Sequence, residues 1–93
     1  MVDTFMNDNY RLLKLMYDSQ IILLNKKFVP LTQLEMAGVL GFSKMKVNAI
    51  FIDLQEKGYI TKIARGKYSL SDMSETIIKS IESIEEKEKN ESQ

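Results

Sequence analysis

The sequence contains no cysteine and no histidine, and proline occurs only once among its 93 residues. The absence of cysteine excludes disulfide bonds and thiolate metal sites, and the absence of histidine excludes histidine general bases and histidine zinc sites. No set of aspartates and glutamates stands out as a catalytic group. We therefore expect that the chain is not an enzyme and that it uses no cofactor and no metal.

The sequence also lacks a run of about 18 apolar residues that would cross a membrane. Its first residues do not have the basic and then apolar layout of a secretory signal. With 44% hydrophobic and 28% charged residues, the composition is that of a globular protein. We expect a single domain over residues 1–88, a charged flexible tail over residues 89–93, a cytoplasmic location and no membrane partner.

The formal net charge is zero, which by itself argues against a nucleic-acid partner. The charges are nevertheless unevenly distributed along the chain. Residues 42–70 contain six basic and two acidic residues, a balance of +4, whereas residues 71–93 contain three basic and seven acidic residues, a balance of −4. The basic segment therefore keeps nucleic acid among the candidate partners.

Residues 33–52 have the spacing of two short helices that are joined by a tight turn. Ala37 is small where the helices would cross, and Gly41 allows the positive φ angle that such a turn favours. Val47 and Ile50 lie six and nine residues after this glycine and return to face the first helix. This spacing is typical of the helix-turn-helix unit of DNA-binding proteins.

The flanking segments predict two further helices and a β-hairpin. Apolar residues recur at helical spacing before this unit, and Pro30 favours a short extended segment after them. Thr32 and Ser43 are expected to cap the two helices of the unit, and Asp72 with Glu75 forms a candidate capping box for the last helix. The expected elements are helices at 9–24, 33–40, 44–57 and 73–87, an extended segment at 28–31, and strands at 59–63 and 67–70.

The order helix, short strand, helix, turn, helix, hairpin, helix resembles that of winged helix-turn-helix proteins, and residues 30–72 carry this resemblance. The runs Leu-x-x-Lys-Gly-Tyr-Ile at 54–60 and Tyr-x-Leu-Ser-Asp at 68–72 resemble MarR-type regulators and TubR-like centromere-binding proteins of plasmid and phage partition systems. Both groups are homodimers that bind DNA, so the resemblance implies the same here. The expected fold class is mainly α with a small β-hairpin wing (α+β).

The candidate DNA contacts lie on two elements, the first turns of the third helix and the predicted wing. A recognition helix presents its first turns to base edges and phosphates, and a basic wing contacts the backbone or enters a minor groove. Each residue alone is also compatible with an ordinary solvated surface, and the complete winged pattern favours binding. The candidate residues are Ser43, Lys44, Lys46, Asn48, Lys62, Arg65 and Lys67.

Isoleucines at three- and four-residue steps form an apolar stripe on the last predicted helix. That helix would be roughly 22 Å long and would project beyond a compact body of this size. An exposed apolar stripe is unfavourable in water, so we expect a dimer interface there, with packing on the chain's own domain as the alternative. The stripe consists of Ile77, Ile78, Ile81 and Ile84.

The sequence therefore predicts a homodimer that binds double-stranded DNA in a sequence-specific way. Its role would be that of a transcriptional regulator or of a centromere-binding adaptor in DNA partition, and the second role would add a filament-forming motor protein as a partner. About eight phosphate contacts in a dimer would give a logarithmic salt slope approaching −7. The alternative is a winged-helix module that binds another protein and does not bind DNA.

Overall fold

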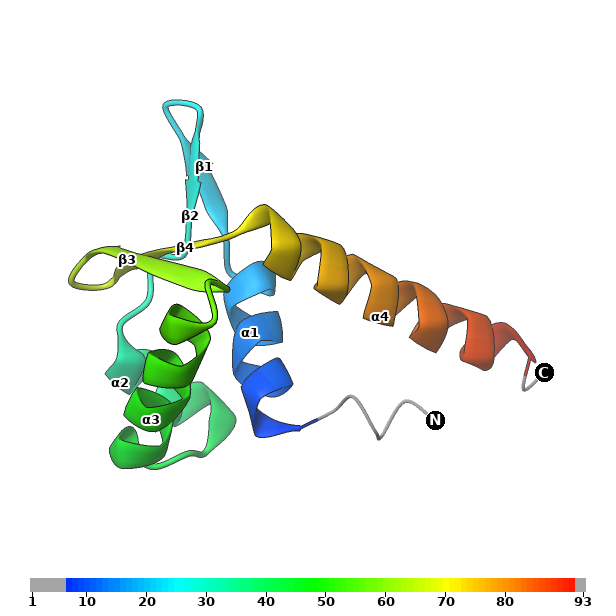
Figure 1. Ribbon diagram of the computed structural model, residues 1–93, viewed down its shortest axis with the longest axis horizontal. Coiled ribbons are helices and arrows are strands. Elements are labelled where there is room, and N and C mark those ends of the chain that lie inside the picture. The colour runs from blue at the N-terminus through cyan, green and yellow to red at the C-terminus, as the bar shows by residue number, and fades with distance from the viewer. Residues whose placement is uncertain (1–6, 92–93) are drawn as a thin grey trace.

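The computed structural model describes residues 7–91, so residues 1–6 and 92–93 of the predicted domain and tail lie outside it. Four helices and two antiparallel hairpins confirm the α+β fold class (Figure 1). No helix within the described range is both long enough and apolar enough to cross a membrane. The elements are α1 (Asp8–Asp18), β1 (Ile21–Leu23), β2 (Lys26–Phe28), α2 (Gln33–Leu40), α3 (Lys44–Glu56), β3 (Ile60–Ala64), β4 (Lys67–Leu70) and α4 (Asp72–Glu91).

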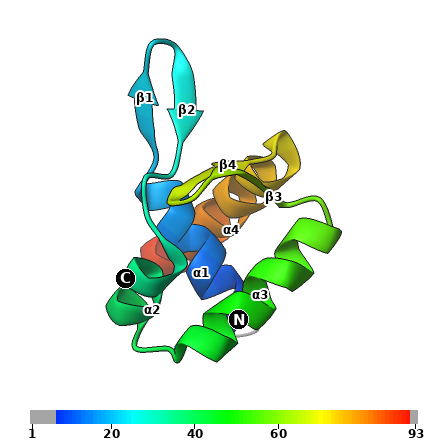
Figure 2. The ribbon, with the colours of Figure 1, turned by 90° about the vertical axis from the view of Figure 1, so that its left-hand side faces the viewer.

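Helix α1 occupies the centre of the molecule, and α2, α3 and α4 pack around it (Figures 1 and 2). The helix-turn-helix spacing predicts the contact between α2 and α3 correctly, because Ala37, Val47 and Ile50 are all buried there. Apolar area removed from water at this junction is the main stabilising contribution to such a small domain. The core consists of Tyr10, Leu12, Leu13, Met16, Val29, Met36, Ala37, Val47, Ile50, Phe51, Leu54, Ile60, Tyr68, Ile78 and Ile81.

The turn between α2 and α3 and the caps beside it form as the sequence predicts. Gly41 has a φ angle of 71°, and the Phe42 N–H donates to the Ala37 carbonyl at 3.0 Å. At the start of α2, the Glu35 N–H donates to the Thr32 hydroxyl at 3.1 Å, and the Glu35 carboxylate accepts from the Thr32 N–H at 2.9 Å. These hydrogen bonds hold the pKa of Glu35 below its usual value.

The wing formed by β3 and β4 is fastened to the core by a third segment of chain. The Val29 N–H donates to the Tyr68 carbonyl at 2.7 Å, and the Tyr68 N–H donates to the Val29 carbonyl at 3.1 Å. The Tyr68 ring lies 4.8 Å from the Phe51 ring of α3, measured between centroids. Thus the extended segment predicted around Pro30 is realised at Val29, where it pairs with the wing.

The structure corrects the predicted helix over residues 9–24, because α1 ends at Asp18 and a hairpin follows. Strands β1 and β2 pair Ile21 with Phe28 and leave Leu24 and Asn25 as a two-residue turn with φ angles of 51° and 63°. Two positive φ angles match the right-handed twist of a tight hairpin. The hairpin projects from the body beyond the wing (Figure 2).

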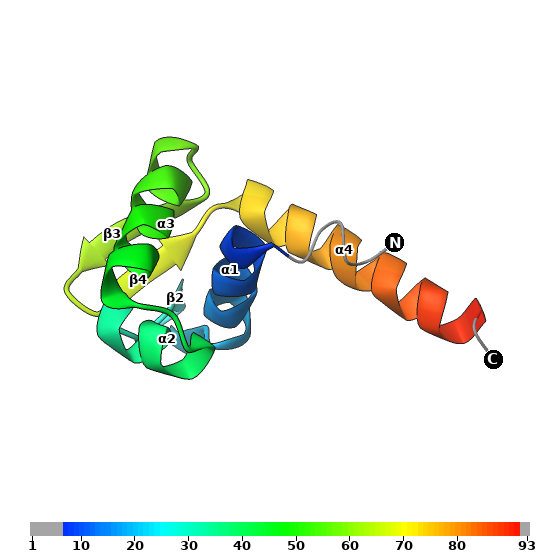
Figure 3. The same cartoon turned by 90° about the horizontal axis from the view of Figure 1, so that it is seen from below.

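Helix α4 also departs from the prediction. The Ser74 N–H donates to the Ser71 hydroxyl, and the Ser74 hydroxyl donates to the Tyr59 carbonyl at 2.6 Å, so Ser71 replaces the expected capping box. The helix then continues to Glu91, through three residues of the predicted tail. It extends well away from the body (Figure 3).

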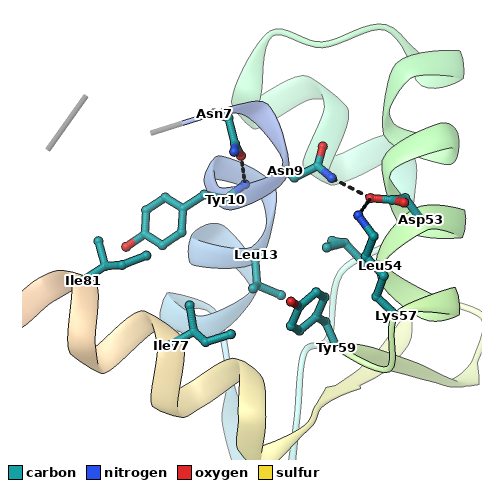
Figure 4. A pocket seen from close by; sticks show the side chains of 10 residues that line it. All are labelled: Asn7, Asn9, Tyr10, Leu13, Asp53, Leu54, Lys57, Tyr59, Ile77 and Ile81. Carbon is teal, nitrogen blue, oxygen red and sulfur yellow. Dashed lines mark hydrogen bonds and ion pairs between the residues drawn. The ribbon is translucent and has the colours of Figure 1, made fainter. Parts of the chain in front are cut away.

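The predicted dimer stripe is corrected in part by the packing of α4 on α1. Ile78 is completely buried and Ile81 is 9% exposed, so both belong to the chain's own core. They face inward because α4 lies across α1, and Figure 4 shows Ile81 beside Tyr10 of that helix. Ile77 is half-buried, and Ile84 is 41% exposed.

Candidate nucleic-acid interface

Three basic side chains from separate elements meet around one open hollow of about 350 Å³. Lys44 comes from the start of α3, Lys62 from β3, and Arg65 from the loop between β3 and β4. None of the residues that line this hollow is acidic, so its electrostatic potential favours an anion. The remaining lining residues are Thr32, Gln33, Leu34, Gly66 and Tyr68.

Close contact between the wing and α2 gives the hollow its shape. Gly66 has a φ angle of 68°, and a Cβ atom built at this position would lie 3.2 Å from Cγ2 of Thr32. Because Thr32 caps α2, the loop of the wing sits against the N-terminus of that helix. A residue without a side chain therefore both closes the hairpin and brings Arg65 over the hollow.

The two lysines predicted in the first turn of α3 lie on different sides of that helix. Lys44 lines the hollow, whereas the ammonium group of Lys46 forms an ion pair with Asp8 of α1. Residues two positions apart on a helix differ by about 160° around its axis at 3.6 residues per turn. Ser43 caps the helix by accepting a hydrogen bond from the Lys46 N–H at 3.1 Å.

Lys46 belongs to a second basic group that includes α1. Its ammonium group lies 4.4 Å from the centre of the Phe42 ring, and the Arg11 guanidinium lies 5.1 Å from the same ring. Asp8 also pairs with Arg11 at 3.7 Å. The hydrogen bond from Lys46 holds the pKa of Asp8 below its usual value, so Asp8 offsets part of the positive charge on this side at neutral pH.

The structure thus brings together only part of the predicted set. Lys44, Lys62 and Arg65 share the hollow, whereas Lys46 contacts α1. The Lys67 ammonium group lies 4.5 Å from the Phe28 ring, on the side of the first hairpin. Ser43 and Asn48 are exposed, and their contact with DNA stays a prediction, as it does for the whole set.

Sequence reasoning missed Gln33 and Arg11 as members of the interface. Gln33 follows the cap residue Thr32, so its place in the first turn of α2 was available from the capping box. Arg11 offered no such signal, because its position beside Phe42 depends on how α1 packs against the turn between α2 and α3.

A second hollow, of about 270 Å³, lies between α1, α3 and α4 (Figure 4). Asn9 donates to Asp53 at 2.8 Å and Lys57 donates to the same carboxylate at 3.1 Å, which ties α1 to α3 at its rim. Ile77 and Tyr59 supply part of its apolar wall. Across residues 7–91, no group of three or more acidic side chains is placed to hold a metal ion.

Residues 10–75 match the model of the Crp-like helix-turn-helix domain. Among solved structures, the reduced (Fe(II)) CO-sensing protein from R. rubrum is similar with a TM-score of 0.64 and 22% identity, over 76% of this chain and 36% of that chain. No curated protein has a significantly matching sequence.

Two transcriptional regulators of the CRP/FNR family from Thermus thermophilus are also similar. One has a TM-score of 0.64 and 19% identity, over 91% of this chain and 43% of its own; the other has 0.59 and 17%, over 71% and 36%. The chain therefore spans less than half the length of these relatives. The comparisons support a winged helix-turn-helix and do not confirm the finer likeness to MarR-type or TubR-like proteins.

Proposed function

Because the chain belongs to the family of Crp-like helix-turn-helix domains, we propose that it binds double-stranded DNA and regulates transcription. The single observation that carries this proposal is the hollow in which Lys44, Lys62 and Arg65 converge without an acidic neighbour in its lining. Phosphate groups of the DNA backbone are the anions that such a surface favours beside a helix-turn-helix unit. Helix α3 then enters the major groove, and the wing contacts the flanking backbone.

Charge reversal at the hollow tests DNA binding directly. The triple variant Lys44→Glu, Lys62→Glu, Arg65→Glu should lose more than about a hundredfold in affinity at low salt, and the logarithmic salt slope should become smaller by about 3 for each bound chain. Fluorescence anisotropy with a labelled duplex, titrated at several salt concentrations, measures both quantities.

A matched control separates this effect from a change in net charge. Lys26, Lys79 and Lys87 are exposed and lie on β2 and α4, away from the hollow. Their triple change to glutamate alters the net charge equally and should leave affinity within about threefold, since distant exposed charges are screened by salt. Equal losses in both triple variants, or no binding by the unaltered chain to any duplex, would favour the protein-interaction alternative.

Of the two roles that the sequence leaves open, transcriptional regulation is the one that the relatives support. The two proteins from Thermus thermophilus are described as transcriptional regulators. No feature of residues 7–91 favours the partition adaptor or a filament-forming partner. Binding to the sequence upstream of the chain's own gene, with changed transcription of a reporter, would support regulation.

The same proposal includes a homodimer formed through α4. This helix of 20 residues extends beyond the body, and Ile84 is 41% exposed on its projecting part. Ile84→Asp should convert dimers to monomers without loss of folding, because it does not disturb the buried Ile78 and Ile81. Light scattering distinguishes the two states, and an unaltered chain that is already monomeric contradicts this part of the proposal.

A further inference from the structure

The exposed face of α3 is mostly apolar, which is unusual for a surface that meets a polyanion. Met45 is 84% exposed and Ile52 is 48% exposed, and Ala49 is exposed between them. Asn48 is the polar member of the same face. These four residues lie at steps of three and four, so they form one line along the helix, here named the outer stripe.

The outer stripe is bordered by basic groups on both sides. Lys44, with the wing, flanks one side, and Lys46, with Arg11, flanks the other. The major groove is about 12 Å wide and is bordered by two phosphate backbones, so two basic flanks around one helix are complementary to it. The side chains between the flanks are then placed against base edges rather than against phosphates.

Base edges in the major groove differ in the apolar contacts that they offer. Thymine alone presents a methyl group there, and adenine presents the donor and acceptor pair that asparagine bonds. Met45, Ala49 and Ile52 have no polar atom that reads guanine or cytosine, and Asn48 suits adenine. Glu56 follows one turn after Ile52, beyond the N-terminal turns that contact bases in helix-turn-helix proteins.

We infer that α3 reads A·T base pairs in the major groove, through contacts of Met45, Ala49 and Ile52 with thymine methyl groups and of Asn48 with adenine. This inference rests on the proposed DNA binding and specifies its target. Lys44 and the wing supply affinity that does not depend on sequence, and the outer stripe supplies the discrimination. The sites that the protein prefers should therefore contain runs of A·T pairs where α3 enters.

Replacement of thymine by uracil tests the inference because it removes only the methyl group. A duplex selected from a random pool for binding is remade with deoxyuridine in place of thymidine. Affinity should fall about fourfold for each methyl group that a side chain covers. The salt slope should stay unchanged, since the phosphate contacts are the same.

Inosine·cytosine duplexes separate major-groove from minor-groove reading. Inosine paired with cytosine reproduces the minor groove of an A·T pair but not its major groove, and 5-methylcytosine restores a methyl group there. We expect weak binding to the unmethylated duplex and stronger binding once the methyl groups are present. Equal affinity for the two would point to minor-groove reading and would overturn the inference.

Two isoleucine variants assign the discrimination to the outer stripe. Ile52→Ser should bring the ratio of thymine to uracil affinities close to one, whereas Ile63→Ser should leave it unchanged. Ile63 is a matched control because it is 52% exposed but lies on β3, outside the stripe. Both side chains are exposed, so neither change should prevent folding.

The outcomes distinguish this inference from the function on which it depends. A chain that binds thymine and uracil duplexes equally well binds DNA but does not read methyl groups, which contradicts the inference alone. Enriched sites made of G·C pairs contradict it in the same way. A chain that binds no duplex at low salt contradicts the proposed function, and the inference falls with it.

Discussion

The two β-hairpins have the same topology, but their side chains meet very different surroundings. In the wing, Tyr68 is 3% exposed and packs on Phe51, and the backbone of β4 bonds to Val29. In the first hairpin, Ile22 is 72% exposed and Leu24 is 86% exposed, and only Phe28 at its base is buried. The comparison shows that the contacts of the inward residues, rather than strand pairing, hold a hairpin in place.

The difference matters for function because a DNA-binding surface needs its charges at fixed positions. Arg65 and Lys62 are carried by the hairpin that is fastened to the core, and Gly66 brings its loop against α2. The first hairpin carries its exposed apolar residues on strands that contact little beyond each other. Four predictions test this contrast.

The largest expected effect comes from truncating the residue that fastens the wing. Tyr68→Ala should lower the free energy of unfolding by about 3–5 kcal/mol, because it removes a buried aromatic ring and leaves a cavity beside Phe51. Ile22→Ala in the first hairpin should change it by less than about 0.5 kcal/mol. Urea unfolding followed by circular dichroism measures both.

A conservative variant keeps that test interpretable if Tyr68→Ala does not fold. Tyr68→Phe retains the ring and its contact with Phe51, so it should fold and stay close to the unaltered chain in stability. Similar losses for Tyr68→Ala and Ile22→Ala would mean that the two hairpins are held equally, contrary to the comparison.

The next effect concerns the turn of the wing. Gly66→Ala should cost about 1–2 kcal/mol, because alanine is strained at a φ angle of 68°. Its Cβ atom would also press on Thr32 and displace the loop, so DNA affinity should fall as well. Thermal unfolding and anisotropy measure the two effects, and unchanged values in both would show that the loop does not need a glycine.

The turn of the first hairpin should respond in the opposite direction. Leu24 has a φ angle of 51°, which is unfavourable for leucine but tolerated by asparagine. Because Leu24 is 86% exposed, Leu24→Asn sacrifices little burial and should raise the free energy of unfolding by about 1 kcal/mol. Leu23→Asn, on the strand, is the control and should bring no gain; a gain in both would indicate an effect of polarity rather than of backbone strain.

This contrast also explains how far the sequence predicts the fold. The helix-turn-helix unit could be predicted because its constraints are local: Gly41 must turn, and Thr32 and Ser43 cap within three residues. The first hairpin could not, because the apolar spacing of α1 continues through Ile21 and Leu24 as it would in a helix. Its turn, Leu24-Asn25, lacks the glycine that usually marks a two-residue hairpin.

The candidate site was predictable to a similar extent. The chain position of Lys44, Lys62 and Arg65 gave their element correctly, and the fold then placed them around one hollow. Lys46 has the same local signature as Lys44 but pairs with Asp8, 38 positions away in the chain. A partner so distant in sequence follows from tertiary packing, which local patterns do not contain.

The smallest expected effect concerns a basic side chain of the wing that turns toward the first hairpin. The Lys67 ammonium group lies 4.5 Å from the Phe28 ring, and such cation–π contacts contribute about 0.5–1 kcal/mol at exposed sites. Lys67→Met keeps the apolar stem and removes the charge, so it should lower the free energy of unfolding by about 0.5 kcal/mol. If Lys67 serves the contact between the hairpins rather than DNA, the salt slope of binding should stay the same, whereas Lys62→Met should reduce it by about 1. An equal reduction for both would return Lys67 to the DNA-binding set that the sequence predicts, and the wing would then present all of its basic side chains to the backbone.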